Sequence, residues 1–212
     1  MGSGGAKLAT CRGRITIQCI SEGGAWNSAY SYYNKSTSSI EFDGDGWYNG
    51  STGIKVVAGD NVKFGEGEGF FIENGMDDPI DLQISGEVGL TPKNVLPGGD
   101  KFCMSGNPSP VNVSLADVSV SLLDDSELGT CRGKITAQQM DADAKWIASY
   151  AYYNKSSSSV EFDGAGWYNE KTGAKIIKDT DSDVTMTPGE AYFFQNGMDD
   201  SVKLTYPNPI SK

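Results

Sequence analysis

Alternating apolar and polar residues recur along the chain and predict β-strands. Ile15 and Ile17 point one way while the polar residues beside them point the other, which is the period of two expected of a half-buried strand. Two short apolar runs, F-F-I from Phe70 and Y-F-F from Tyr192, each end near Asn-Gly. Both runs are predicted to be buried strands.

An aromatic hairpin is the most distinctive pattern, and it occurs twice. Trp26, Tyr30 and Tyr32 are expected to share one face of a strand. Asn-Lys and a run of serines then turn the chain, and Ile40 and Phe42 are predicted to form the returning strand before an Asp-Gly turn. The same positions in the second copy are Trp146, Tyr150, Tyr152, Val160 and Phe162.

The hairpins belong to a longer internal repeat. Cys11 and Cys131 align at a constant offset, and C-R-G, Y-Y-N-K, E-F-D-G and G-W-Y-N are identical in both copies. Residues 99–125 have no counterpart in the first copy. The predicted organisation is an added tag over 1–5, a first repeat over 6–88 without its opening strands, a Gly- and Pro-rich boundary over 89–98, and a complete second repeat over 99–212.

The opening of the second repeat carries further strand patterns. Valine and leucine alternate with polar residues over 111–115 and again over 118–122, and a single helical turn fits residues 114–118. No amphipathic helix is evident. The predicted fold is all-β, built from two related, mainly antiparallel, β-sandwich-like repeats.

Charge and composition narrow the functional classes. The 212 residues carry a formal net charge of -11, which disfavours nucleic acid and anionic membranes because phosphates would be repelled. No apolar run approaches the roughly 18 residues of a spanning helix. Histidine is absent, which excludes Ser-His-Asp and Cys-His nucleophilic sites and zinc sites that use imidazole. We therefore expect no nucleic-acid partner and no membrane insertion.

The four cysteines leave two alternatives open. Cys103 and Cys131 lie in the second repeat and form the candidate disulfide of an exported protein, worth roughly 3–4 kcal/mol for a loop of this length. Cys11 and Cys19 can pair only if the strand between them bends sharply, because extended residues between them span more than a disulfide allows. The other alternative is that the cysteines are buried free thiols in a reduced protein.

The aromatic turns are the candidate binding groups. A Trp beside a Tyr in a Gly-flanked turn is hard to bury completely, and such rings stack on sugars while neighbouring amides bind hydroxyls. The predicted ligand-binding residues are Trp47, Tyr48, Asn49, Trp167, Tyr168, Asn169, Tyr32 and Tyr152. The alternative is that these rings fill the sandwich core or pack between the repeats.

Acidic residues suggest two further chemistries, neither of which we favour. Calcium prefers several oxygen ligands, and the candidates are Asp43, Asp45, Asp77, Asp78, Asp199 and Asp200. Asp beside Gly is also an ordinary turn residue. The paired carboxylates Glu41 with Asp43 and Glu161 with Asp163 have spacing compatible with glycoside hydrolysis, but a site made twice in small repeats is more often structural. No cofactor and no enzyme activity are expected.

One stretch carries a family resemblance. The segment P-G-G-D-K-F-C-M-S-G-N-P-S-P-V-N-V-S-L-A-D-V, followed by W-Y-N and P-G-E-A-Y-F-F, resembles repeat units in secreted proteins of unassigned function from bacteria of the Verrucomicrobia and Lentisphaerae type. The resemblance covers most of residues 90–207 and, without its start, 6–86. It implies export, a β-rich fold and tandem arrays.

These patterns predict a non-enzymatic extracellular or cell-surface module, with its leader removed, that binds a glycan or a surface protein through the aromatic turns. The alternative is a structural subunit that self-associates into a filament or surface layer. A repeat without its opening strands would leave an open strand edge, and open edges recruit strands from neighbours.

Overall fold

The protein is almost entirely β, as the sequence predicts. The computed structural model describes residues 8–20, 26–57, 69–82, 93–107, 109–141, 143 and 145–208. Within these ranges the only helical element is a 3-10 turn, and no helix has the length and apolarity that crossing a bilayer requires. The chain divides into two compact units, one of Met1–Cys19, Trp26–Lys63 and Phe71–Gly86, the other of Ile20–Ala25, Phe64–Phe70 and Glu87–Lys212.

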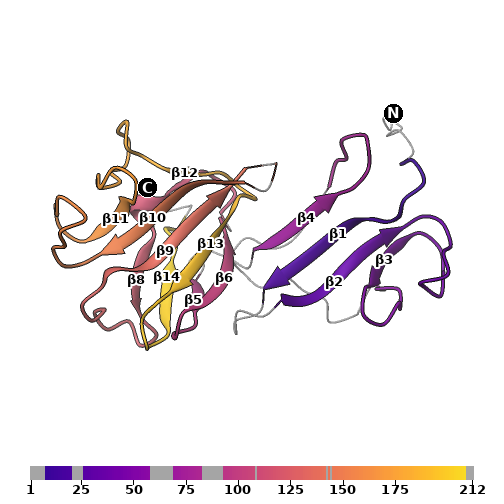
Figure 1. The fold of residues 1–212 in the computed structure, drawn as a ribbon, viewed down its shortest axis with the longest axis horizontal. Coiled ribbons are helices and arrows are strands. Elements are labelled where there is room, and N and C mark those ends of the chain that lie inside the picture. The colour runs from indigo at the N-terminus through magenta and orange to yellow at the C-terminus, as the bar shows by residue number, and fades with distance from the viewer. Residues whose placement is uncertain are drawn as a thin grey trace. The chain divides into compact units, whose positions relative to one another are not determined.

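The first unit is organised around a four-stranded sheet in the order β3-β2-β1-β4 (Figure 1). Its strands are β1 (Arg12–Ile20), β2 (Trp26–Tyr33), β3 (Gly46–Asn49) and β4 (Phe70–Asn74). β2 and β3 pair antiparallel with Tyr32 opposite Trp47. Ile15 and Ile17 on β1 are buried, as their alternation predicts.

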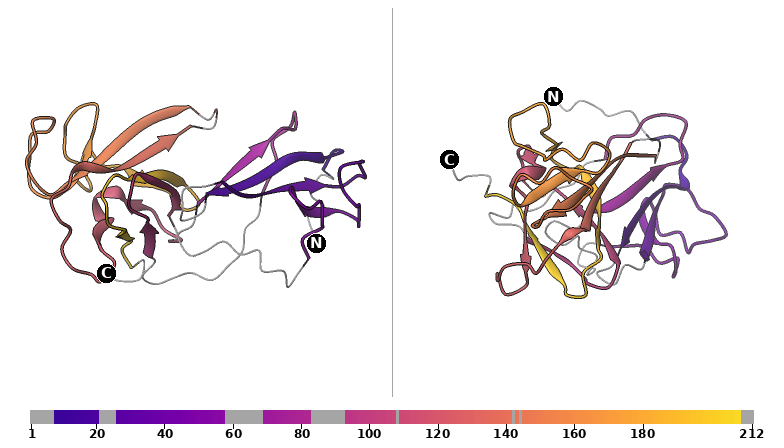
Figure 2. Two further views of the ribbon diagram at one scale, coloured as in Figure 1. Left: turned by 60° about the horizontal axis from the view of Figure 1, so that its bottom comes forward. Right: turned by 60° about the vertical axis from the view of Figure 1, so that its left-hand side comes forward.

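The second unit is a β-sandwich. A five-stranded sheet has the order β11-β10-β9-β13-β6, a three-stranded sheet has the order β5-β14-β8, and β12 pairs with β7. The elements are β5 (Lys93–Leu96), β6 (Lys101–Gly106), β7 (Val113–Ser114), η1 (Leu115–Asp117), β8 (Ser119–Leu122), β9 (Arg132–Met140), β10 (Trp146–Tyr153), β11 (Gly166–Asn169), β12 (Thr185–Met186), β13 (Ala191–Asn196) and β14 (Val202–Thr205). Figure 2 shows these strands from two further directions.

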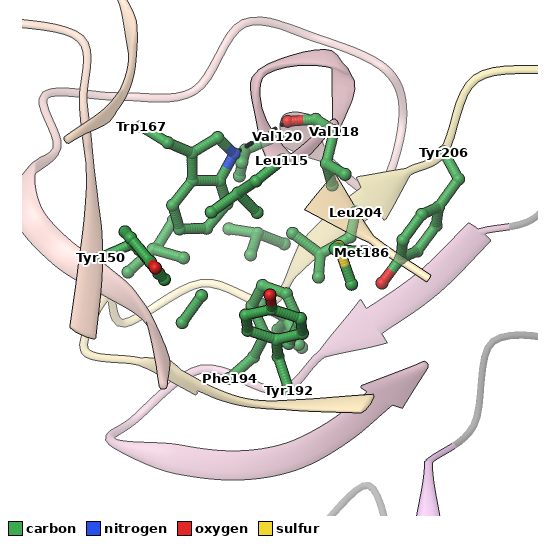
Figure 3. Close-up of a cluster of buried hydrophobic side chains, with 14 of the residues drawn as sticks. Leu115, Val118, Val120, Tyr150, Trp167, Met186, Tyr192, Phe194, Leu204 and Tyr206 are labelled. Carbon is green, nitrogen blue, oxygen red and sulfur yellow. Dashed lines mark hydrogen bonds between the residues drawn. The ribbon is translucent and has the colours of Figure 1, made fainter. Parts of the chain in front are cut away.

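One apolar core joins the two larger sheets of the second unit (Figure 3). Tyr192 and Phe194 reach it from β13, and Leu204 reaches it from β14. Trp167 of β11 is 1% exposed, and its indole N–H donates a hydrogen bond of 2.9 Å to the Val118 carbonyl oxygen beside η1. The core therefore depends on η1, which the sequence predicts as a single turn and which Ser114 caps by accepting from the Ala116 N–H.

The returning strand of each hairpin lies later than predicted. Ile40 and Phe42 are not in a strand, and the partner of β2 is the G-W-Y-N segment, β3. The Tyr48 hydroxyl accepts from the Asp43 N–H at 2.8 Å and donates to the Gly44 carbonyl at 2.7 Å, while Phe42 stacks on its ring. Phe42 thus covers Tyr48, and the apolar alternation at 40 and 42 does not indicate a strand.

Two further boundaries differ from the expectation. The predicted boundary segment 89–98 contains β5, which pairs antiparallel with β14, so the second repeat begins before residue 99. β13 alternates between buried and partly exposed residues as a buried strand should, but β4 ends in the exposed residues Ile72, Glu73 and Asn74. The prediction that both strands are buried is therefore correct only for the second repeat.

The predicted Cys103–Cys131 disulfide is wrong, because all four cysteines are buried and none of them forms a disulfide. Cys103 on β6 lies opposite Phe194, which lies opposite Ala137 on β9, and Ala137 follows Cys131 by six residues. At about 3.3 Å per strand residue the thiols are on the order of 20 Å apart, far beyond bonding reach. Cys11 and Cys19 are similarly separated along β1, without the sharp bend that pairing would need.

Candidate ligand-binding site

The residues identical in the two repeats form a common hydrogen-bonded framework. The Cys11 N–H donates to Asn34 Oδ1 at 2.7 Å, and the Cys131 N–H donates to Asn154 Oδ1 at 2.7 Å. The Cys11 thiol donates to the Tyr32 carbonyl at 3.2 Å, and the thiol of Cys131 makes the same bond in the second repeat. These bonds link the start of β1 to the end of β2 in the first repeat, and the start of β9 to the end of β10 in the second.

The glycine of C-R-G and the tyrosine before Asn-Lys form a second element of the framework. Gly133 has a φ of 81°, and a Cβ there would lie 2.6 Å from the Tyr153 hydroxyl. Gly13 and Tyr33 repeat the arrangement with a φ of 78°. Backbone geometry and close ring packing both favour glycine here, so this motif needs no ligand to explain it.

Most of the predicted aromatic binding residues lie inside the protein. Tyr48, Trp167 and Tyr168 are essentially inaccessible, so the expectation that G-W-Y-N is an exposed turn is wrong for them. The segment is a strand with one ring on each side: Trp167 enters the sandwich core and Tyr168 enters a smaller cluster with Ala151 and Tyr153. Trp47, Tyr32 and Tyr152 are partly buried, and Tyr32 and Tyr152 pack edge-on against Trp47 and Trp167.

The two predicted asparagines have local bonds of their own. Asn49 Oδ1 accepts from the N–H groups of Ser51 at 2.9 Å and Thr52 at 3.1 Å. Asn169 Oδ1 makes the same pair of bonds with Lys171 and Thr172. These are the bonds of a turn that follows each strand, which explains the asparagine in both repeats.

The calcium candidates do not form a cluster. Across the described part of the chain, no three His, Cys, Asp or Glu side chains gather closely enough to hold a metal ion. Asp43 contributes its backbone carbonyl oxygen to the ammonium group of Lys55, and the same bond joins Asp163 and Lys175. Asp77 lies 3.5 Å from the Arg14 guanidinium on the surface.

An open cleft lies at the start of β10 in the second repeat. Its volume is about 570 Å³, and it is lined by Gln138, Trp146, Ile147, Ala148, Ser149, Asn169, Glu170 and Lys171. Three adjacent strands, β9, β10 and β11, contribute to it, together with the turn after β11. Of the predicted ligand-binding residues, only Asn169 lines this cleft.

A β-bulge places Trp146 in the cleft. Trp146 lies opposite Met140, but Ala148 lies opposite Gln139, so Ile147 is an additional residue in β10. Because of the bulge, Trp146 does not lie on the same face of β10 as Tyr150, which is buried in the core. The prediction that Trp146, Tyr150 and Tyr152 share one face is therefore wrong. A bulge leaves no signal in the alternation of apolar residues, which is why the sequence pattern did not indicate Trp146.

The Trp146 ring is supported but not covered. It is 55% exposed, and it packs edge-to-face against Phe193 with 5.4 Å between ring centroids. Phe193 in turn contacts Phe102 of β6 at 6.4 Å. This aromatic row crosses the outer side of the five-stranded sheet and holds the indole in place while leaving about half of it accessible.

Polar groups surround the exposed ring. The Glu170 N–H donates to the Ser149 carbonyl at 3.0 Å, and the Ser149 hydroxyl donates to the Glu170 carboxylate. Lys171 is exposed beside them, so the cleft contains one acid and one base. Burial, followed by the nearby Glu190 carboxylate, raises the pKa of Tyr150 on the opposite face of β10. The cleft thus offers an apolar platform with amide, hydroxyl and balanced charged groups.

Comparison of this chain with protein-family models, with curated proteins and with solved structures finds no match.

Proposed function

We propose that the second repeat is a non-enzymatic binding module that takes a neutral glycan in the cleft beside Trp146. The observation that carries the proposal is the exposed indole. Trp146 and Ile147 are adjacent, both are more than half exposed, and large apolar side chains grouped on a surface indicate a binding site. The proposed site replaces the G-W-Y-N segment as the place of binding.

The chemistry of the cleft supports a sugar ligand. An indole face stacks on the C–H groups of a sugar ring, and aromatic rings with one accessible side serve this purpose in binding sites. Gln138, Ser149 and Asn169 line the same cleft and supply amide and hydroxyl groups suited to sugar hydroxyls. The net charge of -11 repels polyanions, which favours a neutral glycan.

The proposal also places the protein outside the cell or at its surface. Because none of the four cysteines forms a disulfide, the disulfide no longer supports export. The location therefore rests on the resemblance of the sequence to exported repeat proteins.

Affinity electrophoresis through gels that contain neutral polysaccharides tests the proposed function. We expect the full chain to be retarded by at least one of a β-glucan, a xylan, a mannan or soluble chitin. Trp146→Ala should reduce the retardation by about tenfold or more, since a stacked aromatic ring dominates such sites. Leu123→Ala is the matched control, because Leu123 is 51% exposed in the same unit and does not line the cleft.

Two results would contradict the proposal. One is that none of the polysaccharides retards the protein. The other is that Trp146→Ala and Leu123→Ala bind as the unaltered chain does. A change in tryptophan fluorescence on adding oligosaccharide gives an independent readout. The exposed indole of Trp146 should respond to the ligand, whereas the buried indole of Trp167 should not.

A further inference from the structure

Ile147 gives the cleft a second apolar group beside the indole of Trp146. It is the additional residue of the β10 bulge, it lines the cleft, and it is 56% exposed. A plain hexose has one main apolar surface, the C–H groups on a face of its ring, and the indole alone is sufficient to cover that surface. A ligand that also covers Ile147 therefore carries a separate apolar group next to its ring.

The consecutive residues Glu170 and Lys171 give the same cleft a carboxylate and an ammonium group. The Ser149 hydroxyl donates to the Glu170 carboxylate, and the Glu170 N–H donates to the Ser149 carbonyl at 3.0 Å, so the acid is held against β10. A carboxylate only accepts hydrogen bonds, and an ammonium group only donates them. An amide complements this pair without a net charge, because it has one N–H donor and one C=O acceptor.

Two side-chain amides add donors to the cleft. Gln138 reaches it from β9 and lies opposite Ser149 in the strand pair. Asn169 Oδ1 already accepts the N–H groups of Lys171 and Thr172. The group that Asn169 offers a ligand is therefore its Nδ2 donor, which suits a carbonyl or hydroxyl oxygen.

The first repeat has different residues at three of these positions. Asn27, Ala29 and Gly50 align with Ile147, Ser149 and Glu170. A Cβ at Gly50 would lie 3.0 Å from the Ala29 carbonyl oxygen. The second apolar group and the acid–hydroxyl pair therefore belong to the second repeat and are not part of the framework that the repeats share.

We infer that the cleft binds a glycan whose sugar carries an acetamido group, which is the N-acetylhexosamine class. The sugar ring stacks on Trp146, the acetamido methyl group contacts Ile147, and the acetamido N–H donates to Glu170. Lys171 and Asn169 supply the donors for the acetamido oxygen and for hydroxyl groups. The inference rests on the proposed function and specifies which sugar the same cleft selects. A sugar with a charged amine is disfavoured, because Lys171 would repel it.

Pairs of sugars that differ only in the acetamido group test the inference. The first pair is N-acetylated chitotetraose and cellotetraose, which share length and linkage. The second pair is the methyl glycosides of N-acetylgalactosamine and galactose. Each is titrated against the full chain and followed by tryptophan fluorescence. In at least one pair, we expect the acetamido sugar to bind about tenfold more tightly or more, which is the effect of one added hydrogen bond and one covered methyl group.

Two variants remove the groups that select the acetamido sugar. Ile147→Asn introduces the first-repeat residue, and Glu170→Gln keeps the shape of the side chain while placing an amide donor where the acetamido N–H needs an acceptor. Both should lower the affinity for the acetamido sugar to about that of its partner. The matched controls are Ile177→Asn and Glu161→Gln, since both side chains are exposed in the same unit and neither lines the cleft. Unchanged melting temperatures confirm that the variants fold.

Three results would overturn this inference and leave the proposed function standing. The first is equal affinity for the two members of both pairs. The second is a preference for the acetamido sugar that survives both Ile147→Asn and Glu170→Gln. The third is tighter binding of fully deacetylated chitotetraose than of the acetylated form, which would mean that Glu170 selects an ammonium group. Binding of no sugar by the unaltered chain would overturn the inference and the proposed function together.

Discussion

Two buried tyrosines of the second repeat show that a buried hydroxyl group can stabilise or destabilise the fold, depending on whether it has a hydrogen-bond partner. The Tyr206 hydroxyl forms a buried hydrogen bond with the hydroxyl of Ser105. The Tyr192 hydroxyl has no hydrogen-bond partner among the described residues, although its ring is fully enclosed. A buried polar group without a partner costs free energy, and one with a partner does not.

Replacing each tyrosine with phenylalanine should therefore give opposite results. Tyr206→Phe leaves the Ser105 hydroxyl without this hydrogen-bond partner and should lower the free energy of unfolding by about 1–2 kcal/mol. Tyr192→Phe removes an unsatisfied hydroxyl and should leave the free energy unchanged or raise it by up to about 1 kcal/mol. Urea unfolding followed by circular dichroism measures both, and equal losses in the two variants would contradict the assignment of partners.

At the scale of elements, the 3-10 turn η1 helps to hold Trp167 in the core of the second unit. Trp167 and Trp47 lie in identical G-W-Y-N strands and contact equivalent tyrosines at 5.4 and 5.5 Å. Of the two, only Trp167 reaches the end of η1, where the C-cap residue Val118 accepts the hydrogen bond of the indole. The same local sequence thus has two environments.

Truncation of the two tryptophans should separate these environments. Trp167→Ala removes a fully buried ring and should destabilise the second unit by about 3–5 kcal/mol. Trp47→Ala should cost clearly less, since part of the ring already contacts water. Differential scanning calorimetry of the full chain measures both, and a Trp47→Ala loss as large as that of Trp167→Ala would contradict the partial exposure of Trp47.

At the scale of the whole molecule, buried tyrosines make the stability of the fold depend on alkaline pH. Burial raises the pKa of Tyr32 in the first repeat and of five tyrosines in the second, which are Tyr150, Tyr152, Tyr168, Tyr192 and Tyr206. A tyrosine whose folded-state pKa is raised keeps its proton in the folded state after the unfolded chain has lost it. Its contribution to stability is complete below the unfolded-state pKa of about 10 and is lost as the pH rises further.

The free energy of unfolding should therefore fall as the pH rises above about 10, with the second repeat responding most. Tyr192→Phe should move the midpoint of alkaline unfolding to higher pH. Absorbance of tyrosinate and circular dichroism, recorded together along the titration, test this. Ionisation of all tyrosines before any loss of structure would contradict the burial of these side chains.

Local sequence pattern was sufficient for many elements of the fold but not for β3, β5 or the candidate site. The alternation at Ile15 and Ile17, the single turn at Ser114 and the duplicated motifs are encoded within a few residues, so β1, η1 and the repeat were predictable. Trp146 was not, because one bulged residue, Ile147, reverses which face of β10 it occupies.

The sequence by itself determined that the chain is all-β and built from two related repeats, because side-chain alternation and turn chemistry are local properties. Only the tertiary structure decided that Trp167 and Tyr168 are core residues and that Cys103 and Cys131 stay apart. Both outcomes depend on which distant strands become neighbours. The same holds for Ile72, which aligns with the buried Phe194 in sequence and is nevertheless 41% exposed.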